Sequence, residues 1–188
     1  MSEKKLSINE SKHCLSSLRK KVNDNILITE GNGIIYSAKI SNIENNQVTY
    51  DNLNIIYQHK QKTKIHIAIA PPKNKTRFEW FLEKVTEIGI DSISPIICDY
   101  SERKKINQIR CEKILISAMK QSNNAILPKL NKPIPFQTII HNIQTNTYIA
   151  HCHNRKKSLF QKILLKTKKP KNISLFIGPE GDFSEKEL

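Results

Sequence analysis

The residues best suited to bind a ligand lie near the C-terminus, in the tetrapeptide Gly-Pro-Glu-Gly at positions 178–181. This tetrapeptide follows the apolar run Ile173–Ile177, which is typical of a buried strand. Its two glycines permit positive φ and a close approach of the backbone, while Pro179 stiffens the turn. Main-chain amides at such a strand end bind carboxylates or riboses, and Glu180 is placed to accept hydrogen bonds from hydroxyl or amine groups. A plain turn between a strand and a helix is the alternative.

Two basic segments are expected beside this loop. Residues 71–77 follow a predicted strand over Ile65–Ala70, and residues 101–105 follow a predicted strand over Ser92–Ile97. Because the carboxyl ends of parallel strands meet at one edge of a sheet, the three loops are expected to line one electropositive cleft. For either basic segment alone, a solvated surface is the alternative.

The sequence His151-Cys152-His153 raises the question of a metal site, because alternate residues of a strand share a face. Two imidazoles without a third ligand do not make a zinc site, and no acidic residue is adjacent. We therefore expect histidines with ordinary hydrogen bonds and no metal. The four cysteines lack paired C-x-x-C spacing, which favours reduced, mostly buried thiols.

The elements that must position these residues fall into two parts. Residues 1–63 contain a helix over about 7–18 that opens with a capping box at Ser7, and then three strand-like runs over 26–30, 34–43 and 47–57. Hairpin-type connections between these runs predict a small antiparallel barrel. In residues 64–188, strands and helices alternate, which predicts a mostly parallel sheet covered by helices on both faces. The fold class is therefore α/β plus β.

Local signals set the expected bounds of the later helices. A capping box at Thr76 begins one helix, and Gly89 suits its C-terminal cap. A further capping box at Ser184 predicts a helix of which only one turn is present, so we expect a chain truncated relative to a complete α/β domain. The other expected elements are a helix over about 106–122, a strand over Tyr148–Cys152, a helix over Ser158–Leu165 and a strand over Ile173–Ile177.

The chain is strongly basic. Its 31 lysines and arginines outnumber 17 acidic residues, for a formal net charge of +14. Such an excess favours polyanionic partners, above all nucleic acid, through counterion release. A compositional bias toward Lys, Asn and Ile is the alternative. No apolar run approaches the roughly 20 residues of a membrane span, and no signal sequence precedes the first helix, which indicates a cytoplasmic protein with no membrane partner.

Several motifs together resemble a known family, in order and spacing, over nearly the whole chain from His13 onward. Residues 177–184 resemble the I-G-P-E-G-G-F-S motif of RsmE-type 16S ribosomal RNA (uracil-N3)-methyltransferases, members of the SPOUT superfamily. Residues 73–89 are similar to the family's P-K-x-x-R-x-E-W…K-x-T-E-L-G stretch, and residues 101–103 match its S-E-R. Residues 12–19 and 121–128 resemble its H-x-x-x-V-L-R and E-Q-S…V-P segments.

This resemblance implies a PUA-like RNA-binding barrel in residues 1–63 and a SPOUT (trefoil-knot) methyltransferase domain in residues 64–188. It implies methylation of N3 of a specific uridine in 16S ribosomal RNA, with S-adenosylmethionine as donor and a homodimer as the assembly. By position, one wall of the donor pocket consists of Ile177, Gly178, Pro179, Glu180 and Gly181. The expected RNA contacts are Arg19, Lys20, Lys73, Arg77 and Arg103. No catalytic residue is assigned, since Glu180 and an arginine-rich segment of the family are equal candidates for the general base.

The chain also departs from the family pattern. Family members carry a motif close to L-G-x-x-R-L-R-T-E-T-A some tens of residues after the glycine loop, and it closes the knot. These 188 residues do not contain it, so we expect the knot segment to be missing at the C-terminus. Lys120 stands where the family often has Glu, and Asn124 where a basic residue is common. A catalytically inactive RNA-binding fragment or remnant of such an enzyme is the alternative function.

Overall fold

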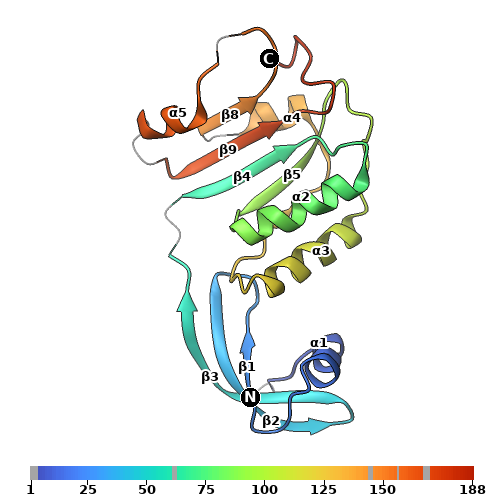
Figure 1. The fold of residues 1–188 in the computed structure, drawn as a ribbon, viewed down its shortest axis with the longest axis vertical. Coiled ribbons are helices and arrows are strands. Elements are labelled where there is room, and N and C mark those ends of the chain that lie inside the picture. The colour runs from blue at the N-terminus through green and yellow to red at the C-terminus, as the bar shows by residue number, and fades with distance from the viewer. Residues whose placement is uncertain (1–3, 61–62, 144–145, 156, 167–169) are drawn as a thin grey trace. The chain divides into compact units, whose positions relative to one another are not determined.

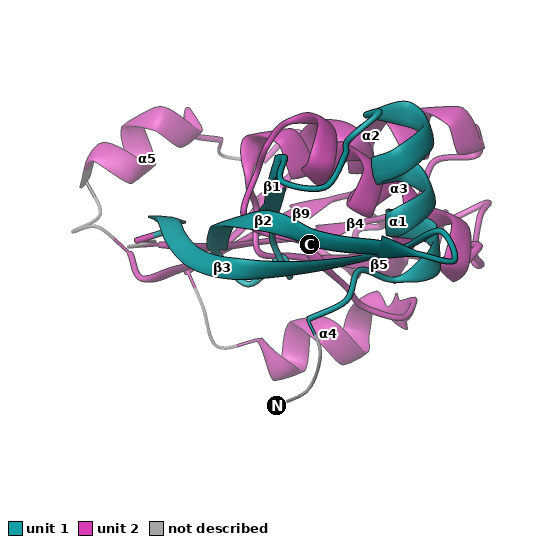
Figure 2. Cartoon of the chain, turned by 90° about the horizontal axis from the view of Figure 1, so that it is seen from below, with its two compact units in different colours: residues 1–59 teal, residues 60–188 magenta. Residues whose placement is uncertain are grey.

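The computed structural model describes residues 4–60, 63–143, 146–155, 157–166 and 170–188. The chain forms two compact units, residues 1–59 and 60–188, which Figure 2 distinguishes by colour. Each unit has hydrophobic core residues of its own. None of the helices in the described part of the chain is long and apolar enough to cross a membrane.

The first unit is a helix followed by an antiparallel sheet. Its elements are α1 (Ile8–Lys12), the π-helical turn η1 (His13–Ser17), β1 (Asn25–Ile28), β2 (Ile34–Glu44) and β3 (Gln47–Gln58), with the strands in the order β1-β2-β3. Ser7 caps α1, because its Oγ accepts a hydrogen bond from the Glu10 N–H at 3.2 Å, as the capping box predicts. Cys14, Ile40 and Val48 are buried in its core.

All three strands predicted for this unit are present. Pairing of β2 with β3 contains three register shifts, between Ile35 and Tyr36, Ser37 and Lys39, and Ile40 and Asn42. Bulges of this kind bend a strand and increase its twist. Within residues 4–59, the result is an open three-stranded sheet with one further bridge from Lys5 to Thr49, where the sequence predicted a barrel.

The second unit is built on a parallel sheet, which Figure 1 shows as a stack of strands beside two long helices. The strand order is β6 (Lys129–Leu130), β5 (Ser92–Ile97), β4 (Lys64–Ile69), β9 (Asn172–Ile177) and β8 (Asn146–Ala150), and β7 (Ile134–Pro135) also pairs with β5. The central pair, β4 and β9, joins the two ends of the unit, since Lys64 pairs with Asn172 and Ile69 with Ile177.

Helices cover both faces of this sheet, as the alternation of elements predicts (Figure 2). They are α2 (Lys75–Ile88) and α3 (Gln108–Gln121) on one face and α4 (Phe136–Asn142) on the other, with α5 (Phe160–Lys166) following β8. Side chains of a strand alternate between faces, so Ile67 and Ile69 pack toward α2 and α3, while Ala68 and Ala70 pack toward Phe136.

Two predicted helix starts differ in the structure. Helix α2 begins at Lys75 because Asn74 is its N-cap and accepts the Thr76 N–H at 2.8 Å, so Thr76 lies inside the helix. Asparagine caps helices better than threonine does. Gly89 ends the helix with φ of +88°, as predicted. At Ser184, the capping box forms in part: Glu187 Oε2 accepts the Ser184 N–H at 2.8 Å, whereas the Ser184 hydroxyl donates to Asp99 Oδ2 at 2.6 Å, and residues 185–187 form a turn.

Three short elements were not predicted, namely β6, β7 and α4. The two strands have two residues each, too few for an alternating pattern to show. Helix α4 has seven residues and an N-cap proline without a side-chain capping bond, so it lacks the usual start signal. The helix is stabilised by the burial of Phe136 against the sheet and not by local helix propensity.

Candidate functional site at the carboxyl edge of the sheet

The three loops singled out in the sequence meet at one edge of the second unit. β4 pairs in parallel with β5 on one side and with β9 on the other. The loops that follow these strands, at residues 70–74, 98–107 and 178–184, therefore leave from the same edge, as predicted.

Glu180 links the glycine loop to the loop after β4. Its Oε1 accepts a hydrogen bond from the Lys73 N–H at 3.0 Å, and its side chain is otherwise exposed. The Asp182 N–H donates to the Pro179 carbonyl at 2.9 Å and closes the turn. Glu180, which was expected to accept hydrogen bonds from a ligand, therefore also holds the loop in position.

The two glycines of the loop serve close packing. A Cβ on Gly178 would lie 3.0 Å from the Phe183 ring, and one on Gly181 would lie 3.3 Å from the Cβ of Tyr100. Neither glycine has positive φ, so that part of the prediction is wrong. The turn places its left-handed residue at Asp182, with φ of +65°, where the short polar side chain tolerates this conformation.

Arg103 holds the loop after β4 from the other side. Its Nε donates to the Pro72 carbonyl at 3.0 Å, and its Nη2 donates to the Lys73 carbonyl. The Lys73 ammonium pairs with Glu102 at 2.8 Å, and both side chains are largely exposed, so this pair adds little stability. The structure therefore brings Lys73 and Arg103 together at the edge with the glycine loop, and gives Arg103 a role in shaping it.

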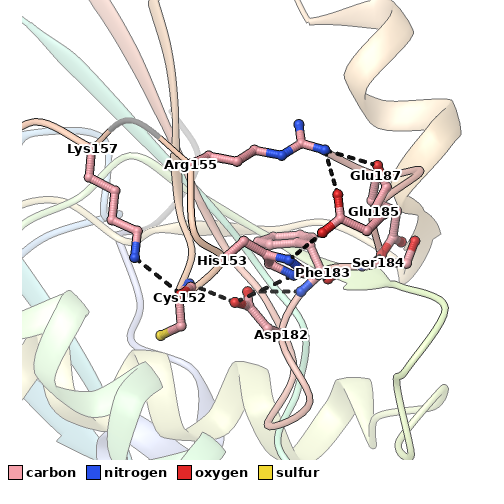
Figure 3. Close-up of polar contacts among 9 residues, drawn as sticks. All are labelled: Cys152, His153, Arg155, Lys157, Asp182, Phe183, Ser184, Glu185 and Glu187. Carbon is pink, nitrogen blue, oxygen red and sulfur yellow. Dashed lines mark hydrogen bonds and ion pairs between the residues drawn. The ribbon is translucent and has the colours of Figure 1, made fainter.

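A fourth loop, after β8, fastens the far side of the glycine loop (Figure 3). Asp182 accepts two main-chain hydrogen bonds, from the Cys152 N–H at 2.6 Å through Oδ2 and from the Phe183 N–H at 2.8 Å through Oδ1. Arg155 pairs with Glu185 at 2.7 Å. We call Cys152, His153, Arg155, Asp182 and Glu185 the clasp.

His153 is the centre of the clasp. Its Nε2 lies 2.6 Å from the Phe183 carbonyl and its Nδ1 lies 2.9 Å from Glu185 Oε1 (Figure 3). Both partners are acceptors, so both bonds form together only when the imidazole is protonated. The sequence predicted ordinary hydrogen bonds for His153, and the structure shows which groups make them; the acidic residues that follow the glycine loop, 182 and 185, were the signal for its partners.

The pH dependence of the clasp follows from His153. The Phe183 carbonyl, and then Glu185, raise the pKa of this imidazole above its usual 6.5. A raised folded-state pKa contributes stability that is complete below pH 6.5 and is lost as pH rises through the raised pKa. We expect the melting temperature of the chain to fall over that interval, and less so in His153→Gln. The exposed His141 offers a control, since His141→Gln should keep the wild-type profile. A His153→Gln profile that matches wild type would contradict the assignment.

The remaining predicted residues lie in different parts of the chain. Ile177 ends β9, its carbonyl accepts the Ala70 N–H at 2.9 Å, and Pro179 is buried. Arg77 is exposed on α2. Arg19 and Lys20 belong to the first unit, where Arg19 is exposed in the turn after η1 with φ of +52°.

The thiols and histidines of the described residues offer little redox or metal chemistry. Cys14, Cys98 and Cys111 are buried and Cys152 is exposed. Burial raises the pKa of Cys98 to about 12, so this thiol stays protonated and is a poor nucleophile. Across the described ranges, no group of three His, Cys, Asp or Glu side chains is arranged to hold a metal ion.

Comparisons with known proteins agree with this architecture. A family model described as an RNA methyltransferase domain matches residues 59–188, and one described as an RNA methyltransferase PUA domain matches residues 9–49. The chain is 30% identical to ribosomal RNA small subunit methyltransferase E of Buchnera aphidicola over 187 residues, which cover 95% of this chain and 72% of the relative. It is 31% identical to ribosomal RNA small subunit methyltransferase E 2 of Borreliella burgdorferi, over 94% of this chain and 73% of the relative.

Solved structures show the same fold. A probable rRNA-methyltransferase from Porphyromonas gingivalis superimposes with a TM-score of 0.85 at 33% identity, over 99% of this chain and 79% of that chain. Ribosomal RNA small subunit methyltransferase E from Neisseria gonorrhoeae, solved bound to S-adenosyl methionine, superimposes with a TM-score of 0.78 at 23% identity, over 97% of this chain and 76% of that chain.

Proposed function

We infer that this chain, which belongs to the RNA methyltransferase family, transfers a methyl group from S-adenosylmethionine to RNA of the small ribosomal subunit. The observation that carries the proposal is the loop of residues 177–181 at the carboxyl end of β9. Glu180 joins it to the loop after β4, and the adjoining Asp182 joins it to the loop after β8. Ligands of open α/β sheets bind at this edge.

The residues at the edge fit this donor. S-adenosylmethionine carries a cationic sulfonium that activates its methyl group for transfer, together with an ammonium, a carboxylate and ribose hydroxyls. The exposed loop residues Glu180 and Gly181 offer a carboxylate and main-chain groups to such a ligand. We propose Ile177, Gly178, Pro179, Glu180 and Gly181 as one wall of the donor pocket.

The chain's own contribution to the reaction is positioning. A methyl transfer needs the acceptor nitrogen and the methyl carbon about 3–3.5 Å apart and in line, so a fixed donor loop lowers the entropic part of the barrier. The hydrogen bonds of Glu180 and Asp182 to neighbouring main-chain amides supply that fixation. We propose Glu180 as a positioning residue, because one of its oxygens already accepts the Lys73 N–H.

We further propose that the atom that accepts the methyl group is N3 of a uridine in 16S ribosomal RNA. The active form is a cytoplasmic homodimer, and residues 1–63 form the RNA-binding domain. The net charge of +14 supports binding to a polyanion. Among the residues expected to contact RNA, Arg19, Lys20, Lys73 and Arg77 are proposed as phosphate contacts. Arg103 is proposed mainly as a holder of the loop, since two carbonyls already engage its guanidinium.

The test combines donor binding with product analysis. The 188-residue chain should bind S-adenosylmethionine in calorimetry, and small subunits from a strain lacking this modification should gain N3-methyluridine in a nucleoside digest read by mass spectrometry. Glu180→Ala should lower both signals, whereas Glu102→Ala, in the neighbouring loop, should leave donor binding unchanged. RNA binding without donor binding would instead favour an inactive RNA-binding protein, and methylation at another base would overturn the N3 assignment.

A further inference from the structure

Trp80 is the single tryptophan of the chain, and it is 62% exposed. It lies on the solvent face of α2, opposite the buried face that carries Phe78, Leu82 and Val85. Leaving a ring of this size in water forgoes the favourable free energy of its burial. Tryptophan is enriched at interfaces, where its ring offers a large apolar surface to a partner, so the outer face of α2 is a candidate binding surface.

The side chains around Trp80 are suited to a polyanion. Residues three and four positions apart are neighbours on a helix surface, which places the exposed Arg77 beside the ring, together with Lys84 and Glu83, which pair with each other at 2.8 Å. Near the start of α2, a hollow of about 90 Å³ is lined by apolar side chains and by Lys75, Glu79 and Arg110, of which Glu79 and Arg110 pair with each other. An aromatic face beside several cations is how proteins bind unpaired nucleotides, by stacking the base and neutralising the phosphate.

A second copy of the chain is a poorer occupant. Contact of this face with its own copy would bring the exposed Lys75 and Arg77 toward the same cations in a chain whose net charge is +14, whereas Glu83 and Glu87 of the same helix are already paired with Lys84. Glu79 pairs with Arg110, at 2.5 and 2.8 Å, and partly neutralises its charge. Lys75 and Arg77 remain exposed on the surface. RNA has the opposite charge and a π-face on every base.

We propose that Trp80 is a stacking platform for an unpaired RNA base, with the exposed Arg77 and Lys75 contacting the adjoining phosphates. The proposal rests on the proposed function, which makes RNA the substrate. It adds a binding surface on the outer face of α2, separate from the donor loop at the carboxyl edge of the sheet.

Because the chain has one tryptophan, its fluorescence reports on this residue alone. A short single-stranded oligouridine should quench the emission of Trp80 on binding. An abasic ribose-phosphate oligomer of the same length, compared at equal occupancy, should leave the emission nearly unchanged, because it has charge and no base. Equal emission changes with the two oligomers would overturn the stacking proposal.

Three variants test the contribution to binding, measured by retention of labelled oligouridine on a filter. Trp80→Ala should weaken binding about thirtyfold, the middle of the range for loss of one base–aromatic stack. Trp80→Phe should restore most of it, while Ile88→Ala, at a 77% exposed apolar residue of the same helix, should match wild type. Equal affinities of Trp80→Ala and wild type would refute the platform, as would a Trp80 emission that changes with protein concentration in the absence of RNA.

These results are separable from the proposed function. If S-adenosylmethionine binds and RNA is methylated while Trp80→Ala behaves as wild type, the stacking platform fails and the enzyme remains. If neither donor nor RNA binds to the wild-type chain, the proposed function itself fails.

Discussion

Replacing Phe183 with alanine is expected to destabilise the second unit by about 3–5 kcal/mol, the usual cost of deleting a buried aromatic ring. The Phe183 side chain is completely buried, and its ring centre lies 5.3 Å from that of Phe136. It also packs against Gly178, where a Cβ would come within 3.0 Å of the ring. This one ring therefore joins the core under α4 to the glycine loop.

The measurement is the free energy of unfolding from denaturant titration followed by circular dichroism. Phe183→Leu, which keeps much of the volume, should lose less than about 1.5 kcal/mol. Phe160→Ala provides a control at a ring that is 38% exposed, and its loss should be much smaller. We also expect Phe183→Leu to bind the methyl donor more weakly than wild type, because the loop loses part of the surface on which it packs. Equal losses for Phe183→Ala and Phe160→Ala would refute the anchoring role.

Replacing Asp182 with alanine is expected to lower the affinity for S-adenosylmethionine by tenfold or more. The substitution removes the acceptors for the exposed Cys152 amide and the partly buried Phe183 amide, and leaving the partly buried amide without a partner costs about 1–3 kcal/mol. It also places alanine at φ of +65°, a conformation that costs an L-residue roughly 1–2 kcal/mol. Both effects release the loop on its β8 side.

A set of three variants separates these two contributions in calorimetry with the donor. Asp182→Gly keeps the backbone conformation without the acceptors, and Asp182→Asn keeps the conformation and one acceptor oxygen. The expected order of affinity is wild type, then Asn, then Gly, then Ala. If Gly equals wild type, the hydrogen bonds of the clasp do not position the loop, and only the backbone conformation matters.

The elements with strong local signals were predicted well. Strand β5 has the predicted bounds, Ser92–Ile97, and Gly89 caps α2 as expected, because apolar runs and glycine caps act within a few residues. The family was also recognisable from the linear motif at residues 177–184 and from the segments spaced around it. Charge alone pointed to nucleic acid, and the sequence placed the glycine loop at the end of a strand.

The tertiary structure decided what the side chains at that edge do. Ser184 has a capping-box sequence, yet its hydroxyl bonds to Asp99, which pairing of distant strands brings within reach. His153 has no nearby acidic residue in the sequence, yet Glu185 lies beside it in the fold. Arg103, which was expected to contact RNA, donates hydrogen bonds to main-chain carbonyls of the loop after β4.

The amino-acid sequence by itself thus determined the order of the longer strands and helices, the position of the glycine loop and the family to which the chain belongs. These depend on short-range signals: periodicity, caps and contiguous motifs. The partners of Glu180, Asp182 and His153 were decided only by the fold. The reason is physical, since a hydrogen bond forms with whichever group the packed strands bring within about 3 Å, and parallel pairing brings together loops that are far apart along the chain.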